Sequence, residues 1–135
     1  MPEIEVALRQ VSDFTSEAAV RTHRQLIDRP EAKGGADQGP MGGELFLASV
    51  GGCFMSNLLA AIRTRDAQVS NVHTDAIGTL AEAPARFTRV ELCVSADYGD
   101  RGEFEKLVEI AARGCIMVNT LRGLVEVNVR IAAAV

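Results

Sequence analysis

The sequence has few of the features that nucleic-acid binding requires. It contains 14 Lys and Arg against 18 Asp and Glu, a formal net charge of −4, and its aromatic residues are five Phe and one Tyr, with no Trp. A nucleic-acid binder needs a basic face, and single-stranded partners also need aromatic rings on which bases stack. The acidic balance and the scarcity of aromatic residues therefore argue against nucleic acid as a partner.

Clustered metal ligands are also lacking. There is no CxxC motif, and His23 and His73 are isolated, whereas a zinc site needs ligands at close, regular spacing. The three cysteines are an odd number, and no basic and apolar signal segment opens the sequence. These features point to a reducing compartment and free thiols, so we expect a cytoplasmic protein without a metal site.

Only one long apolar run is present, from Leu45 to Ile62. It is barely long enough to span a bilayer, and it contains Ser49, Ser56 and Asn57. We interpret it as a buried helix and expect no membrane partner, with a membrane span as the alternative. Because this helix is apolar on nearly all sides, it needs cover on all sides. A chain of 135 residues has little material for that, so we expect a homodimer in which a second subunit supplies part of the cover.

The order of the predicted elements indicates an α+β fold. A loop at 28–43, with five Gly and two Pro, separates a hairpin from the apolar helix. No internal repeat, low-complexity tract or linker interrupts the chain, so residues 1–135 are expected to form a single domain. The periodicity predicts a half-buried strand at 4–11 and further strands at 18–27, 70–81, 86–98 and 124–131, with helices at 44–65, 103–113 and 115–123.

The three cysteines have different surroundings in the sequence. A buried cysteine is by default a small hydrophobic residue, and Cys93, in the middle of a predicted strand, is interpreted in that way. Cys115 follows Gly114 and begins a short helical segment, where the helix dipole and free N–H groups favour a thiolate. Its position is equally consistent with function and with packing.

Cys53 follows Gly51 and Gly52 inside the apolar helix. Each glycine in a helix interior costs about 1 kcal/mol relative to alanine, so two together need a reason. Either they clear space beside a reactive sulfur in a dry pocket, or they allow tight helix packing. The residues alone support these two interpretations equally.

Two segments resemble the cysteine motifs of the OsmC/Ohr family, the osmotically inducible and organic hydroperoxide resistance proteins. They are "ELFLASVGGCFMSNLLAAI" and "GCIMVNTLRGLVEVNVRI", with the two cysteines 62 positions apart, and the loop "DRPEAKGGADQGP" is similar to the segment before the first motif in the OsmC-like branch. The resemblance covers the chain from about residue 26 to the C-terminus. It implies an α+β two-layer fold with an antiparallel sheet and a central buried helix, in an intertwined homodimer.

The resemblance also implies a thiol peroxidase that uses no metal or flavin cofactor. Cys53 would be the peroxidatic thiolate, which attacks the O–O bond of an organic hydroperoxide and becomes a sulfenic acid. Cys115 would be the resolving thiol that condenses with it to a disulfide. An external dithiol, of lipoyl type in this family, would then reduce the disulfide.

Such chemistry needs a cation that keeps the sulfur ionised, and the family uses an arginine fixed by a glutamate. Arg29 is the candidate by position, with Arg24 as the competitor. In the family's peroxidases the glutamate stands ten residues before the cysteine, which here is Gly43, while Glu44 stands nine before. At about 100° per residue, nine helical steps put two side chains on opposite faces. Glu44 could then serve Cys53 only if the helix is kinked or begins later, and it could instead be a helix N-terminal acid.

Three hypotheses follow for the function. The first is a cysteine-based peroxidase for organic hydroperoxides. The second is an OsmC-like redox-sensing or hydrophobic-ligand-binding protein without efficient peroxidase activity, suggested by the missing carboxylate at Gly43 and by the unassigned arginine. Ile116 is a further, mild departure, since it stands where the family often has proline. The third is a structural subunit whose cysteines only pack.

Overall fold

The computed structural model describes residues 1–133, which belong to two compact units, Met1–Phe46 and Leu47–Val135. We call them unit 1 and unit 2. The long helix α1 (Gly42–Thr64) begins in unit 1 and has most of its length in unit 2. The expectation of a single domain over residues 1–135 stays a prediction.

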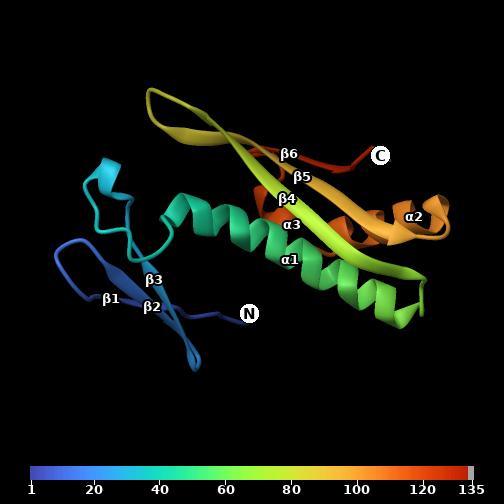
Figure 1. Ribbon diagram of the computed structural model, residues 1–135, viewed down its shortest axis with the longest axis horizontal. Coiled ribbons are helices and arrows are strands. Elements are labelled where there is room, and N and C mark those ends of the chain that lie inside the picture. The colour runs from blue at the N-terminus through green and yellow to red at the C-terminus, as the bar shows by residue number, and fades with distance from the viewer. Residues whose placement is uncertain (134–135) are drawn as a thin grey trace. The chain divides into compact units, whose positions relative to one another are not determined.

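Unit 1 is built on an antiparallel sheet of three strands in the order β1-β2-β3. These are β1 (Ala7–Gln10), β2 (Ser16–Val20) and β3 (His23–Ile27), and a short 3₁₀ helix, η1 (Glu31–Lys33), follows them (Figure 1). The prediction of one strand over 18–27 is wrong, because a turn at Arg21, with φ 53°, divides it into two strands. No Gly, Asn or Pro marks this turn, so the usual sequence signal for a hairpin is missing.

The first strand also differs from its prediction. It begins at Ala7 rather than at residue 4, and all four of its residues are exposed, so it is not half-buried within the chain. Leu8 is 63% exposed. Apolar and polar residues do alternate along this strand, but within the described residues 1–133 no segment covers its apolar face.

Unit 2 contains a second three-stranded sheet, in the order β4-β5-β6. The strands β4 (Val69–Ala81) and β5 (Arg86–Tyr98) are antiparallel, and β6 (Glu126–Ile131) pairs with β5 in parallel. The prediction of an antiparallel sheet is therefore wrong for β6. The reason is the connection, since the chain passes from β5 through α2 (Arg101–Arg113) and α3 (Ile116–Leu121), and a helical crossover returns the next strand in the same direction.

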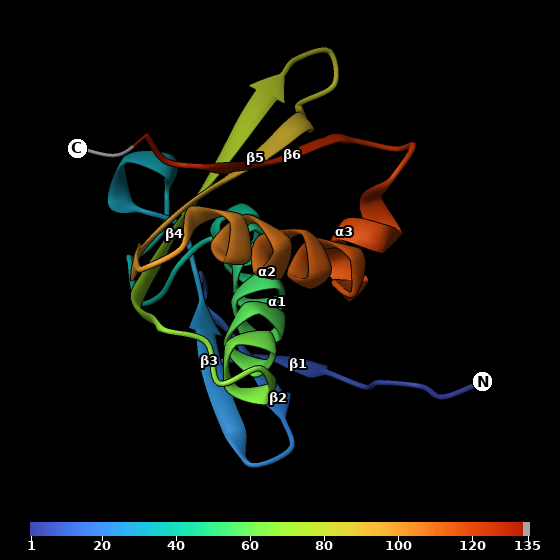
Figure 2. The same ribbon diagram turned by 90° about the vertical axis from the view of Figure 1, so that its right-hand side faces the viewer.

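The core of unit 2 lies between this sheet and the helices. Figure 2 shows α1 and α2 on the same side of the sheet. One face of β5 is turned to this core, because Val90, Leu92 and Val94 are fully buried. Helix α2 contributes an apolar stripe of four buried residues, Phe104, Leu107, Val108 and Ala111, and Gly114 caps the end of the helix.

Helix α1 buries one face and leaves much of the rest open within a single chain. Its buried residues are Val50, Gly51, Phe54, Leu58 and Ala61, while Leu59 is 47% exposed. By length and composition α1 could cross a membrane, as the core helices of many water-soluble proteins also could. The packing of Phe54 and Leu58 in the core identifies its inner face; the predicted second subunit stays a prediction.

Candidate functional site

The two cysteines of the predicted site come together in unit 2. Cys53 lies in the middle of α1 and is partly exposed, and Cys115 is completely buried. Cys115 is the N-cap of α3, as the sequence predicted for the start of a short helix, and its Sγ accepts a hydrogen bond from the N–H of Val118 at 3.5 Å. Both thiols are free, and a hydrogen bond joins their side chains.

The acidity of Cys53 is set by the beginning of α3. Burial raises the pKa of Cys53, but three hydrogen bonds outweigh it, and the pKa lies below the ordinary value of 9.0. These bonds come from the main-chain N–H of Met117, the thiol of Cys115 and the main-chain N–H of Ile116. Donors that point at a sulfur favour its thiolate, so Cys53 is the more nucleophilic thiol of the pair.

Cys115 shows the opposite behaviour. Burial raises its pKa, and so does the neighbouring Cys53, and together they outweigh the N–H groups of Val118 and Met117, which lower it. From the sequence we expected the N-terminal end of the short helix to favour a thiolate on Cys115. In the structure the N–H groups of Ile116 and Met117 lower the pKa of Cys53, whereas the pKa of Cys115 is raised. Cys115 thus stays protonated and can donate its proton to the Cys53 sulfur.

The two glycines before Cys53 have different surroundings. A methyl group at Gly51 would lie 3.4 Å from the Cβ of Ala76 on β4, so this glycine lets α1 lie close to the sheet. A methyl group at Gly52 would meet no atom within 4 Å. Close packing of α1 therefore accounts for Gly51, although against a strand rather than a helix, and the interpretation that the glycines clear space beside the sulfur stays a prediction.

Two features near the thiols were missed at the level of sequence. One is the pair of main-chain N–H groups of Ile116 and Met117, which carry no side-chain signature. The other is Asn57, whose Nδ2 donates to the carbonyl oxygen of Ala111 at 3.3 Å. A polar residue one turn after Cys53 in an apolar helix was the signal that could have identified it.

Cys93 lies on a different face of unit 2. Its register partners are Asp75 on β4 and Arg130 on β6. The parallel pairing of β5 and β6 places the basic residue Arg130 opposite Cys93, which the position of Cys93 in the sequence does not reveal. Arg130 forms an ion pair with Glu91, so its charge already has a carboxylate partner.

Arg29 lies in a tightly bonded loop of unit 1. The carboxylate of the preceding Asp28, which is only 4% exposed, accepts hydrogen bonds from the N–H groups of Arg29, Ala36 and Gln38 and from the hydroxyl of Thr15, at 2.6 to 3.2 Å. Arg29 lines a cavity of about 480 Å³ within unit 1. None of the ion pairs within residues 1–133 involves Arg29.

Arg24 and Glu44 have partners within unit 1. Arg24 is exposed on β3, where its guanidinium lies 3.8 Å from the carboxylate of Glu17. The Glu44 carboxylate accepts the N–H of Met41 at 2.9 Å, which is half of a capping box at the start of α1. The helix begins before Glu44 and continues through Gly51 and Gly52. The roles of Arg29 and Glu44 toward Cys53 stay predictions.

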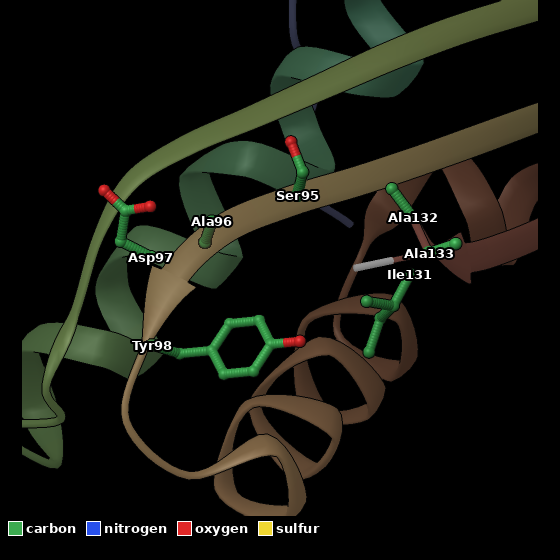
Figure 3. A pocket seen from close by; sticks show the side chains of 7 residues that line it. All are labelled: Ser95, Ala96, Asp97, Tyr98, Ile131, Ala132 and Ala133. Atoms are coloured by element: carbon green, nitrogen blue, oxygen red, sulfur yellow. The ribbon is translucent and has the colours of Figure 1, made fainter. Parts of the chain in front are cut away.

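One cavity of unit 2 lies away from the cysteines. It measures about 530 Å³ and lies where β5 and β6 end. Figure 3 shows Tyr98 and Ile131 at this cavity, and neither Cys53 nor Cys115 lines it. Among residues 1–133, no group of three or more His, Cys, Asp or Glu side chains is arranged to hold a metal ion.

Several solved structures share this fold. A hypothetical protein from Aquifex aeolicus is 16% identical, with a TM-score of 0.83 over 99% of this chain and 98% of that one. An OsmC-like protein from Mycoplasma pneumoniae is 14% identical, with a TM-score of 0.85 over 97% and 96%. The organic hydroperoxide resistance protein of Bacillus subtilis is 20% identical, with a TM-score of 0.71 over 96% and 98%.

No curated protein matches the sequence. The likeness to solved structures, at these low identities, establishes an α+β fold with two small sheets and helices. The family model for OsmC-like proteins matches residues 34–130, which include both motif cysteines and most of the chain. The chain therefore belongs to the OsmC-like protein family.

Proposed function

We propose that this protein is a thiol-dependent peroxidase that reduces organic hydroperoxides, with Cys53 as the peroxidatic and Cys115 as the resolving thiol. The observation that carries the proposal is the hydrogen-bonded pair itself, in which the pKa of one thiol is lowered and that of the other is raised. The family includes organic hydroperoxide resistance proteins, which agrees with this chemistry.

The reaction follows from the two protonation states. The Cys53 thiolate attacks the outer oxygen of ROOH, the O–O bond breaks, and the alkoxide leaves and takes a proton from the solvent to form ROH. Cys53 is then a sulfenic acid. The Cys115 sulfur attacks the Cys53 sulfur and forms the disulfide, and the hydroxyl leaves with the Cys115 proton as water. An external dithiol of lipoyl type reduces the disulfide by exchange and is itself oxidised.

Apolar surroundings favour an organic over a small polar peroxide. The side chain of Ile116, whose main-chain N–H lowers the pKa of Cys53, is 67% exposed to water. An alkyl or aromatic R group gains free energy by removing such a surface from water.

The cation and the second subunit belong to the same proposal. We assign Arg29 as the guanidinium that faces the Cys53 thiolate and Glu44 as the carboxylate that orients it; Arg24 is a weaker candidate because Glu17 already pairs with it. A homodimer would cover the apolar side chains that a single chain exposes. The largest of these in unit 2 are Leu59, Ile77, Leu80, Ile116 and Leu124.

The test is hydroperoxide consumption coupled to a dithiol. Wild-type protein with dihydrolipoamide should turn over cumene hydroperoxide, and Cys53→Ser should abolish turnover. Cys115→Ser should still react once with peroxide but should not complete a cycle. Cys93→Ser, on the other face of the sheet, is the matched control and should keep full activity. Undiminished turnover by Cys53→Ser would eliminate the proposal.

One observation favours the second candidate, a redox-sensing or hydrophobic-ligand-binding protein. The Glu44 carboxylate, which the peroxidase assignment needs beside an arginine, accepts the N–H of Met41. On this reading Cys53 would oxidise slowly and the apolar site would hold a ligand. Stoichiometric oxidation of Cys53 by peroxide on the timescale of minutes, with a small molecule retained through purification, would favour this candidate over catalysis.

A further inference from the structure

The C-terminal end of α2 is held by two asparagine side chains from other helices. The last carbonyl groups of a helix have no partner in the helix itself and must find one elsewhere. The carbonyl oxygen of Ala111 accepts a hydrogen bond from Nδ2 of Asn57 at 3.3 Å. That of Arg113 accepts one from Nδ2 of Asn119, in α3, at 3.0 Å.

The two remaining carbonyl groups of the last turn are bonded by the main chain. Ile110 accepts the N–H of Gly114 at 3.2 Å, and Ala112 accepts the N–H of Cys115 at 3.3 Å. The N–H of Cys115 is thus directed to Ala112, so it does not serve Ala111, and Asn57 supplies the bond that Ala111 would otherwise lack. This donor comes from α1, the helix that carries Cys53.

The Asn57–Ala111 bond lies next to the thiol pair. Asn57 follows Cys53 by four residues in α1, and residues four apart in a helix lie on the same face, one turn apart. Ala111 lies in the last turn of α2, and Cys115 follows the end of that helix by two residues. Along α1, the contact of Asn57 with Ala111 is therefore one turn away from the contact of Cys53 with Cys115.

We propose that Asn57 is a positioning residue: its hydrogen bond to Ala111 fixes the end of α2 on α1 and thereby holds Cys115 and the first N–H groups of α3 against Cys53. Ala111 is only 1% exposed, so without Asn57 its carbonyl group would be buried and unpaired, which is unfavourable enough to displace the end of the helix. Helix α3 has six residues and is too short to keep its position alone.

The inference deepens the proposed function, but its primary readout does not depend on peroxide. In a Cys93→Ser background, the alkylation rate of Cys53 by iodoacetamide is followed against pH and assigned by peptide mass. Asn57→Leu keeps the branched shape of the side chain and removes the donor, and Asn57→Ala removes both. Each should slow alkylation at neutral pH about threefold, which corresponds to a rise of about 0.5 in the pKa of Cys53, with the rate recovering at higher pH.

A second tether of α1 supplies the matched control. The hydroxyl of Thr74 on β4 donates to the sulfur of Met55 at 3.0 Å, so Thr74→Val loosens α1 from the sheet but not from α2. This variant should keep the Cys53 pH profile of the wild type. Disulfide formation by diamide should slow in the Asn57 variants and not in Thr74→Val.

Two results would overturn the inference. One is a folded Asn57→Leu or Asn57→Ala protein, by circular dichroism, with the wild-type pH profile of Cys53. The other is an equal change in Thr74→Val, which would show a general loss of stability. Failure of the peroxidase proposal would give a different result. Wild-type protein would then not consume cumene hydroperoxide, but the alkylation rates would still distinguish the Asn57 variants from the Thr74→Val control.

Discussion

Cys53 and Cys115, 62 positions apart in the sequence, share a hydrogen bond that shifts their acidities in opposite directions. The bond stabilises the thiolate of Cys53 and the protonated form of Cys115. A division of roles thus exists before any substrate arrives, with one sulfur prepared to attack and the other prepared to give up a proton when the disulfide forms.

Removing Cys115 should make Cys53 less acidic. In Cys115→Ala the hydrogen bond from the Cys115 thiol is lost, and the N–H groups of Met117 and Ile116 remain as the groups that lower the pKa of Cys53. Alkylation of Cys53 at neutral pH should fall about threefold and recover as the pH rises, since only the thiolate reacts. An unchanged pH profile in this variant would contradict the shared bond.

Asp28 should make the stability of the protein depend on pH in acid. Burial raises the pKa of Asp28, but the N–H groups of Arg29 and Gln38, the Thr15 hydroxyl and the N–H of Ala36 outweigh it, and the pKa lies below its ordinary 3.8. A carboxyl with a lower pKa in the folded state stabilises the fold above its unfolded-state pKa. This stabilisation is lost as the pH falls through the folded-state value.

The corresponding variant is Asp28→Asn, which should melt several degrees below the wild type at neutral pH and lose less stability in acid. Asp37→Asn is the control, because Asp37 is exposed in the same loop and asparagine tolerates its φ of 54°. Equal melting temperatures for Asp28→Asn and wild type at neutral pH would show that the loop does not depend on this carboxylate.

Gly39 should not tolerate a side chain. A methyl group there would lie 2.2 Å from the carbonyl oxygen of Leu26, so the loop or β3 would have to move. Gly39→Ala should cost about 1–3 kcal/mol in the free energy of unfolding by urea. Gly42→Ala, where the methyl group would meet no atom within 4 Å, should cost almost nothing, and an equal cost at both positions would refute the steric explanation.

The exposed apolar residues of α1 predict a homodimer. Sedimentation equilibrium should give twice the chain mass of 14.4 kDa. Leu59→Glu places a charge on the open face of α1 and should shift the equilibrium toward single chains. Lys106→Gln makes the same change in net charge at an exposed position of α2 and should leave the dimer equilibrium unchanged. A wild-type mass of one chain at micromolar concentration would refute the homodimer.

Periodicity predicted the elements whose apolar residues pack inside their own unit. Val90, Leu92 and Val94 alternate along β5 because the helices cover one face of that strand, and the stripe of α2 reflects the same core. The hairpin at Arg21 was missed because a non-glycine residue adopts the left-handed conformation there. The direction of β6 was not predicted either, since the hydrophobic alternation is the same in parallel and antiparallel strands.

The candidate site was only partly visible in the sequence. The residues around Cys53 and Cys115 agreed equally well with function and with packing, and the resemblance to the OsmC/Ohr motifs is what pointed to these two thiols. The groups that control them are main-chain N–H donors and the amide of Asn57, and these act across more than fifty positions of sequence. Such partners are set by how α1 packs against the corner between α2 and α3, which local patterns of residues do not specify.

The central claim is that Cys53 and Cys115 are one redox pair, and a single peptide map tests it most directly. Reduced wild-type protein is treated with one equivalent of cumene hydroperoxide, its remaining thiols are blocked, and it is digested without reductant. The account predicts that the peptides of Cys53 and Cys115 are joined with the loss of two hydrogen atoms, and that Cys93 carries the blocking group. Blocked thiols at both Cys53 and Cys115, or a disulfide that includes Cys93, would contradict it.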